Sequence, residues 1–183
     1  MSILNRLLAH NQEFVTQKHY KEFSTNKFPD KKILILTCMD TRLLELLPKA
    51  LGLRNGDAKI IKNAGAVISH PFGSIMRSII IGVYQLQVEE VFVIGHHDCG
   101  MANLQPSSII ESVSIHGIDT ERINILQHAG IDFTKWLTGF SCVKESVANS
   151  VEIIQNHPLM PTHILVHGMV IDPKTGQIEL VGS

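Results

Sequence analysis

The chain has 183 residues, of which 44% are hydrophobic and 18% are charged, and its formal net charge is −1. These values are typical of a globular domain with a substantial core and exclude an intrinsically disordered chain. A balanced charge gives no general attraction for nucleic acid or for an anionic membrane surface, so neither is an expected partner.

The cysteine count and the apolar runs bear on location and assembly. Three cysteines do not form a disulfide framework, and an odd number favours a reducing compartment. The apolar runs are too short to cross a bilayer, and polar residues interrupt any signal-peptide pattern near the N-terminus. We therefore expect a cytoplasmic protein. The mean hydropathy of +0.14 suggests a subunit interface, as in a homodimer or a higher homo-oligomer.

The N-terminal segment predicts an amphipathic helix over residues 2–18. A polar stretch over residues 18–32, broken by Pro29, separates this helix from the first apolar run. We therefore interpret residues 1–31 as an N-terminal helical arm. Its apolar face can pack on its own core or on a neighbouring subunit, and the sequence leaves both open. That face comprises Ile3, Leu4, Leu7, Leu8, Phe14 and Val15.

Short apolar runs alternate with helical patterns along the rest of the chain. Runs of this kind are typical of parallel strands that are covered on both faces, here at residues 33–37, 59–61 and 91–95. Helical periodicity follows at residues 43–53 and 74–86, and residues 107–157 are mostly helical, with Ser141 as a predicted N-cap.

The C-terminal segment predicts two more strands, at residues 163–171 and 177–181, joined by a hairpin turn. The whole pattern predicts an α/β fold with a mainly parallel central sheet, flanking helices and an antiparallel edge strand. No linker, repeat or low-complexity tract interrupts it, so we expect a single domain over residues 1–183.

Two motifs directly follow predicted strands. Cys38-Met39-Asp40-Thr41-Arg42 comes after the run at 33–37, and His96-His97-Asp98-Cys99-Gly100 comes after the run at 91–95. Ligands of open parallel sheets bind just beyond the carboxyl ends of the strands, so both motifs can face one crevice. Two thiols, an imidazole and a carboxylate form a ligand set that suits tetrahedral Zn²⁺.

Each motif alone is a weak signal. A single Cys after a strand is usually a small buried apolar residue, and a His-x-x-Cys spacing arises easily by chance. Cys38 and Cys99 are far apart in the sequence and form no Cys-x-x-Cys pair, which disfavours a redox function. Their position at matched strand ends favours a metal site, although the spacing does not exclude a packing role.

The motif pair Cys-x-Asp-x-Arg and Gly-His-x-x-Cys-Gly resembles the signature of the β-class carbonic anhydrases. Further segments resemble the shorter, archaeal-type branch of that family, and the similarity extends over residues 32–181. The resemblance implies an enzyme, a lyase that reversibly hydrates CO₂ to bicarbonate and a proton. It also implies a zinc ion held by Cys38, His96 and Cys99. The further segments are residues 50–53, 56–58, 62–65, 167–168 and 172–176.

Asp40 and Arg42 match the aspartate–arginine dyad of that family. Asp40 can complete the zinc tetrahedron and close the site, or it can pair with Arg42 and leave the fourth position to water. In the open state Asp40 is expected to accept a hydrogen bond from the zinc-bound hydroxide. The alternative is an ordinary surface salt bridge of little energetic value.

Other interpretations remain open at this stage. The same zinc site can serve a hydrolase of CS₂ or COS, and a permanent Asp40 ligand would make the zinc purely structural. Asp98 can orient His96 or a neighbour, or it can cap the segment that follows. Lys59 and Asn63 lie on the segment expected to line the cleft.

Overall fold

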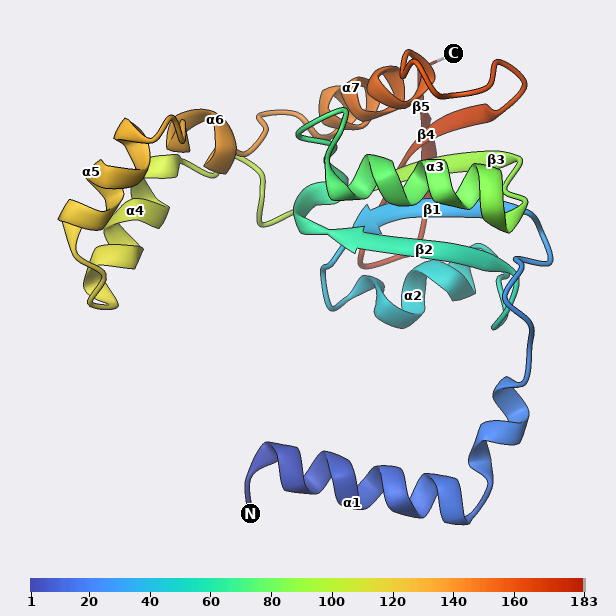
Figure 1. The fold of residues 1–183 in the computed structure, drawn as a ribbon. Helices are drawn as coiled ribbons and strands as arrows, with labels where there is room; N and C mark the ends of the chain where they lie inside the picture. The colour runs from blue at the N-terminus through green and yellow to red at the C-terminus, as the bar shows by residue number, and fades with distance from the viewer. Residues whose placement is uncertain (183) are drawn as a thin grey trace.

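The centre of the protein is a sheet of five strands, β1 (Ile33–Cys38), β2 (Ala58–Asn63), β3 (Glu90–His96), β4 (Leu165–Ile171) and β5 (Ile178–Val181). A computed structural model describes residues 1–182 and gives the strand order β2-β1-β3-β4-β5 (Figure 1). The first four strands in this order are parallel, and β5 runs antiparallel to β4. The predicted α/β class, with an antiparallel edge strand, is confirmed.

Helices cover both faces of the sheet. The helix α2 (Leu43–Ala50) lies on one face, and α3 (Ser74–Leu86) and α7 (Val143–Gln155) lie on the other (Figure 1). A short 3-10 turn, η2 (Ala64–Ala66), follows β2 at the carboxyl edge of the sheet. Within residues 1–182, none of the helices combines the length and apolar character needed to cross a membrane.

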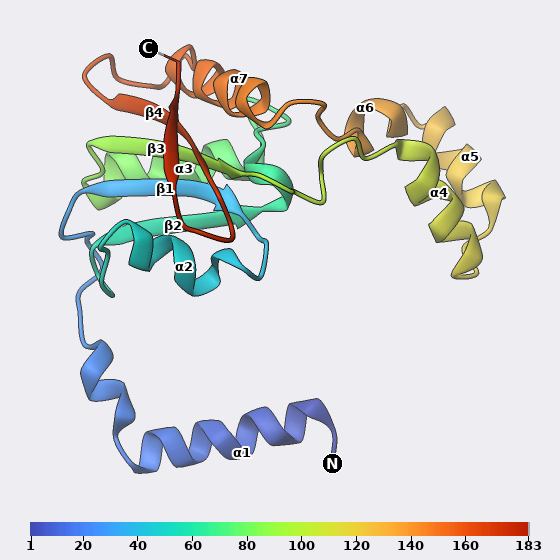
Figure 2. The same ribbon diagram turned by 180° about the vertical axis from the view of Figure 1, so that it is seen from behind.

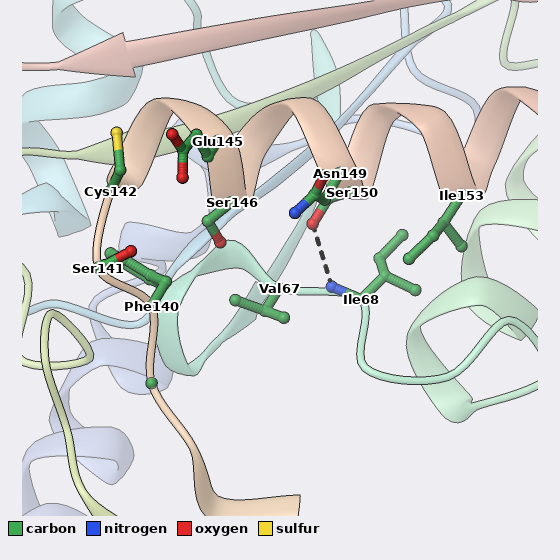
Figure 3. A pocket seen from close by; sticks show the side chains of 11 residues that line it. Val67, Ile68, Phe140, Ser141, Cys142, Glu145, Ser146, Asn149, Ser150 and Ile153 are labelled. Atoms are coloured by element: carbon green, nitrogen blue, oxygen red, sulfur yellow. Dashed lines mark hydrogen bonds between the residues drawn. The ribbon is translucent and has the colours of Figure 1, made fainter. Parts of the chain in front are cut away.

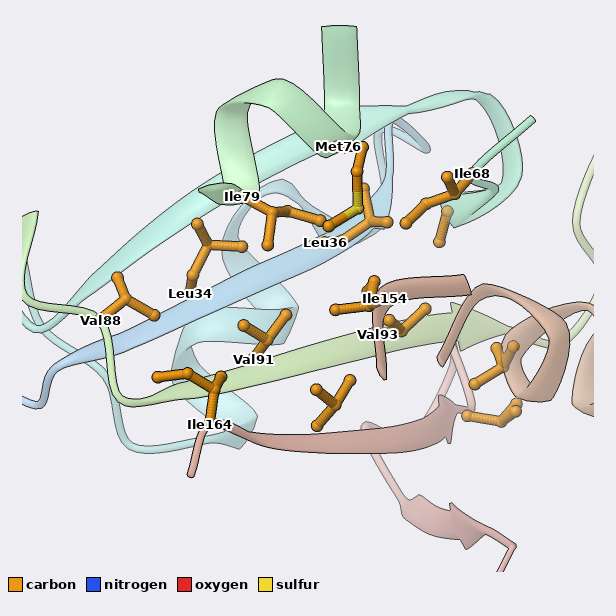
Figure 4. Packing of buried hydrophobic residues seen from close by; sticks show 14 residues of the cluster. Leu34, Leu36, Ile68, Met76, Ile79, Val88, Val91, Val93, Ile154 and Ile164 are labelled. Atoms are coloured by element: carbon orange, nitrogen blue, oxygen red, sulfur yellow. The ribbon is translucent and has the colours of Figure 1, made fainter. Parts of the chain in front are cut away.

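Alternate residues of the central strands supply the two cores. Leu34 and Leu36 of β1 join the larger core under α3 and α7, whereas Ile35 between them joins the smaller core under α2. Burial of both strand faces explains why these segments are continuous apolar runs without polar alternation. Figure 4 shows Leu34, Leu36, Val91 and Val93 in the larger core.

The N-terminal arm stands away from the sheet. Helix α1 (Ile3–Thr16) begins at Ser2, whose hydroxyl accepts a hydrogen bond from the Asn5 amide, and η1 (His19–Phe23) follows it. None of the residues of α1 is buried, and two opposite views show the helix separated from the body (Figures 1 and 2). The predicted helical arm is thus present, two residues shorter at its C-terminal end than expected.

A second projection carries three short helices, α4 (Pro106–Ile115), α5 (Thr120–His128) and α6 (Phe133–Leu137). We call residues 105–138 the helical lobe. It leaves the body after β3 and returns to it just before α7 (Figure 2). The segment predicted as mostly helical is therefore four separate helices, divided by Gly117, Gly130 and Gly139, the first two of which have positive φ.

The prediction of Ser141 as the N-cap of α7 is wrong. Cys142 occupies that position, and no side chain caps the helix there. Ser141 lies one residue too early, because a capping hydroxyl must reach the amides two or three residues after the cap position.

Candidate metal centre

Three side chains with metal-binding atoms meet at the carboxyl edge of the sheet. Cys38 ends β1, His96 ends the neighbouring strand β3, and Cys99 lies in the turn that follows β3. One ligand atom from each residue lies within 4.8 Å of the others, and the two sulfur atoms are 3.9 Å apart. All three side chains are buried. The topology thus brings the two sequence motifs together, as their positions after adjacent parallel strands predict.

The imidazole of His96 has one satisfied and one unsatisfied nitrogen. Nδ1 lies 2.8 Å from the carbonyl oxygen of His97, which can only accept, so Nδ1 carries the proton. Nε2 is buried and has no hydrogen-bond partner within residues 1–182. A buried lone pair without a partner is costly, and a metal cation bound with the two thiolates would satisfy it. The donor set therefore fits a tetrahedral metal site.

The two thiols differ in their electrostatic environment. Burial, the largest influence, raises the pKa of both. For Cys38 this is outweighed by the adjacent His96 ring and by hydrogen bonds from the Gly65 and Asp40 amides, so that the pKa of its thiol falls to about 7. For Cys99 burial prevails and the pKa rises. One thiolate is thus favoured before a metal arrives, and binding a cation must release the other proton.

Asp40 lies beside this cluster and is held by Arg42. The guanidinium donates from Nε to Oδ1 at 3.0 Å and from Nη2 to Oδ2 at 2.8 Å, and the Arg42 amide donates to Oδ1 at 2.9 Å. These bonds hold the pKa of the Asp40 carboxyl well below its usual range. Oδ2 is only 3.8 Å from Nε2 of His96. Asp40 is therefore an ionised carboxylate, paired with Arg42 and adjacent to the candidate metal position.

Asp98 contributes to the same arrangement through Arg42. Arg42 donates from Nη1 to Oδ2 of Asp98 and from Nη2 to its carbonyl oxygen, both at 2.8 Å. It is the carbonyl of His97, and not Asp98, that fixes the His96 ring. Of the roles expected for it, Asp98 thus orients a neighbour, Arg42, and not His96 itself.

Backbone groups around the cluster are harder to predict than side chains, because every residue type has a carbonyl and nearly every one has an amide N–H. The Gly65 amide lies 3.4 Å from the sulfur of Cys38, and the His97 carbonyl holds His96. The signal that could have indicated Gly65 is the Asn-Ala-Gly turn, because it follows a strand that ends at the same edge of the sheet. The remaining cysteine, Cys142, lies apart from the cluster at the start of α7.

Comparison with known proteins assigns this site to a family. The model of the carbonic anhydrase family matches residues 33–178, which include both motifs. The chain therefore belongs to the β-class carbonic anhydrase family, and the resemblance drawn from its motifs is confirmed.

Individual relatives support the same class of protein. The chain is 56% identical to "Putative carbonic anhydrase YvdA" of Bacillus subtilis (strain 168), over 99% of this chain and 92% of that protein. It is also 31% identical to the carbon disulfide hydrolase of Acidithiobacillus thiooxidans, over 82% and 77% of the two chains. Among solved structures, β-carbonic anhydrase isoform I of Trichomonas vaginalis superposes with a TM-score of 0.89 at 34% identity, over 99% and 98% of the chains.

Proposed function

We propose that the protein is a zinc-dependent carbonic anhydrase that reversibly hydrates CO₂ to bicarbonate and a proton, with Cys38, His96 and Cys99 as the zinc ligands. The observation that carries the proposal is the unpartnered Nε2 of His96, buried beside two thiols and beside a carboxylate that an arginine holds. Membership of the carbonic anhydrase family supports the same reaction.

The residues of the chain have separate roles in this proposal. When bound, zinc supplies the Lewis acid that activates water for addition to CO₂. The His97 carbonyl fixes the tautomer in which Nε2 of His96 is free to bind. Arg42 keeps Asp40 ionised and turned toward the guanidinium. The carboxylate can then accept a proton beside the cluster without taking the fourth ligand position of the metal. We therefore assign Asp40 and Arg42 as the catalytic pair.

Two alternatives use the same ligands. Hydrolysis of CS₂ is the second candidate, because a relative named carbon disulfide hydrolase is 31% identical over 82% of this chain. A purely structural zinc site would need Asp40 as a permanent fourth ligand. The bidentate bond from Arg42 to Asp40 disfavours that arrangement, since it turns the carboxylate away from such a role.

A metal analysis of purified protein, combined with stopped-flow CO₂ hydration, tests the proposal. We expect close to one zinc ion per chain and rapid hydration that is lost when a chelator removes the metal. A parallel assay with CS₂ follows release of H₂S. Zinc-loaded protein that hydrolyses CS₂ but does not hydrate CO₂ would support the second candidate, and zinc-loaded protein inactive on both substrates would support a structural site.

Assembly and location complete the proposal. We propose that one domain, residues 1–183, carries residues 1–31 as an arm that packs on a second copy of the chain, giving a homodimer or a higher homo-oligomer. Large apolar residues of α1, among them Leu4, Leu7 and Leu8, are 59–64% exposed in the single chain, which supports this interface. A cytoplasmic location fits three free cysteines. Neither nucleic acid nor a membrane is a proposed partner.

A further inference from the structure

The turn that follows β2 places a backbone amide on one of the thiols. The amide nitrogen of Gly65 lies 3.4 Å from the Cys38 sulfur. To present that amide, Gly65 has a φ of +80° and Ala66 a φ of +58°, which is unusual for a residue with a Cβ. Both residues are buried. Two consecutive left-handed residues persist only where their surroundings fix them, so the turn must be held from outside.

Asn63 holds the turn where it leaves the sheet. It lies opposite Cys38 in the register of β1 and β2, and its carbonyl accepts a hydrogen bond from the Met39 amide at 2.8 Å. Its side-chain Nδ2 donates to the carbonyl oxygen of Val67 at 2.7 Å, which closes the turn around Gly65. The Oδ1 atom is buried without a partner within residues 1–182, so the Nδ2 bond is the polar contact that fixes this side chain.

Ser150 holds the other end of the turn from helix α7. Its hydroxyl accepts a hydrogen bond from the Ile68 amide at 3.2 Å and donates to the carbonyl oxygen of Ala66 at 3.5 Å. Figure 3 shows the bond between Ser150 and Ile68 in a pocket between α7 and the turn. Ser150 is 1% exposed, so its hydroxyl has been buried to make these contacts.

We propose that Asn63 and Ser150 are positioning residues that hold the Gly65 amide on the sulfur of Cys38 and thereby set how strongly this thiolate donates charge to the bound metal. The inference rests on the proposed ligand role of Cys38. An N–H donor directed at a thiolate withdraws electron density from the sulfur, and such contacts around a metal ligand tune the affinity and acidity of the metal. With the amide in place, the metal receives less negative charge.

The same chemistry explains why the contact is made by a backbone group. A side-chain donor such as Lys would add a full charge and a flexible stem, whereas an amide adds a fixed partial charge in a buried site. The donor therefore stays in place only as long as the two side chains hold the turn.

Replacing zinc by cobalt makes the electron donation from the sulfur to the metal measurable by absorption spectroscopy. Thiolate-to-cobalt charge-transfer absorption depends on the energy of the sulfur lone pairs, so a thiolate that loses a hydrogen bond absorbs at longer wavelength. We expect Asn63→Ala and Ser150→Ala to shift this band to longer wavelength. Both should also weaken zinc affinity by about tenfold in a chelator competition, because a Cys38 side chain that the turn no longer orients costs more than the stronger donation from its sulfur gains.

Two residues of the same helix and pocket serve as matched controls. Ser146 lies one turn before Ser150 on α7 and Asn149 lies directly before it, and both line the same pocket. Ser146→Ala and Asn149→Ala should keep the wild-type band and the wild-type zinc affinity. Thermal unfolding of each metal-free variant identifies a protein that is misfolded.

The outcomes separate this inference from the proposed function. A band and an affinity that stay at wild-type values in folded Asn63→Ala and Ser150→Ala would refute the positioning role, and Ser150→Ala decides alone if Asn63→Ala does not fold. Absence of any thiolate band in cobalt-loaded wild-type protein would instead refute Cys38 as a ligand. The spectrum does not depend on which substrate the enzyme uses.

Discussion

At the scale of single residues, the position of Asp40 decides what the site can do. Its carboxylate is held by Arg42 and lies 3.8 Å from Nε2 of His96, so it stands between the guanidinium and the candidate metal position. Its pKa is lower in the folded than in the unfolded chain. The pair therefore stabilises the fold fully above about pH 4 and loses that contribution as the pH falls through the depressed pKa. A change of activity near neutral pH cannot come from titration of Asp40.

The first prediction concerns the pH dependence of this pair. With two thiolate ligands, hydration by the wild type should rise between about pH 7 and pH 9. Arg42→Ala frees Asp40 to occupy the fourth position, so zinc should stay bound while kcat/KM falls about 10- to 100-fold, most at the low-pH end. Asp40→Asn removes the carboxylate that accepts the proton, so this variant should lower the rate at every pH.

The measurement is a stopped-flow pH series on the wild type and both variants, with the zinc content of each determined. Glu45 and Lys49 form an exposed ion pair on the neighbouring helix α2, and Lys49→Ala is the control, expected to keep the wild-type profile. If Arg42→Ala and Asp40→Asn both kept wild-type rates with zinc in place, the pair would be an ordinary salt bridge.

The second prediction concerns the cysteines. Cys38→Ser and Cys99→Ser should lose zinc, because a hydroxyl is a poor substitute for a thiolate ligand. Cys142→Ser should retain it, since Cys142 lies outside the cluster. The zinc content of each variant, measured after dialysis against a weak chelator, tests this prediction. Full zinc retention in either of the first two variants would remove that cysteine from the ligand set.

At the scale of elements, α7 packs closely against the sheet because glycines face it. A Cβ at Gly95 of β3 would lie 2.8 Å from methyl groups of Val143 and Val147, and one at Gly168 of β4 would lie 2.9 Å from Val147. The close approach brings Ser150 of α7 to the turn at Ile68 and Ala66. The helix thus stabilises the core and the site together.

The third prediction tests this contact. Gly95→Ala should destabilise the protein by about 1–3 kcal/mol, because the added methyl group forces α7 away from β3. Gly100→Ala is the matched control: within residues 1–182, no atom beyond the glycine and its two chain neighbours lies within 4 Å of its Cβ position, and we expect a change within about 0.5 kcal/mol. Urea unfolding of the metal-free proteins measures both. Equal stability of the two variants would contradict the packing argument.

Several elements could be predicted from the sequence because their signals are local. The apolar run of β1 and the periodic pattern of α3 gave the right elements, and the position of Cys38 and His96 after strands gave the right edge of the sheet. The contacts that complete the site could not be predicted in the same way. Gly65 acts through its amide and His97 through its carbonyl, and every residue has both groups. Asp98 reaches Arg42 only because β1 and β3 are neighbours.

The separation of the two cysteines shows how sequence distance can mislead. Cys99 lies 61 positions after Cys38, and this separation argued against a pair, yet their sulfur atoms are 3.9 Å apart. The chain passes through β2 and α3 and returns as β3 beside β1, which brings the two cysteines together. What disfavours a redox pair is instead the buried imidazole nitrogen beside the sulfurs, which a cation held with the two thiolates would satisfy.

At the scale of the whole molecule, two projections extend from one compact body (Figures 1 and 2). The large apolar side chains of the arm are exposed in the single chain. The fourth prediction is that the full chain sediments as a dimer or larger, and that removing residues 1–25 weakens the assembly. Burial of the leucine side chains supplies the driving force, at roughly 25 cal/mol for each Å² of apolar surface removed from water. Sedimentation velocity at micromolar concentration measures both proteins.

Two charge variants of α1 distinguish an effect on the interface from an effect on the stability of the helix. Leu7→Glu adds a carboxylate to the apolar face and should dissociate the assembly, whereas Ala9→Glu adds the same charge to the opposite face and should not. A full-length monomer at micromolar concentration would contradict the proposed interface. So would an assembly that Leu7→Glu leaves intact.

The attachment of the helical lobe has a consequence for how this chain tolerates changes in length. The Asn103 amide donates to the Phe140 carbonyl, and the Gly139 amide donates to the Leu104 carbonyl, so the lobe leaves and re-enters the body at the same place. Insertions or deletions between these closed ends alter loop entropy by only about 0.6 kcal/mol for each doubling of length. The lobe is therefore the place where this fold can gain or lose whole helices without shifting the register of any strand.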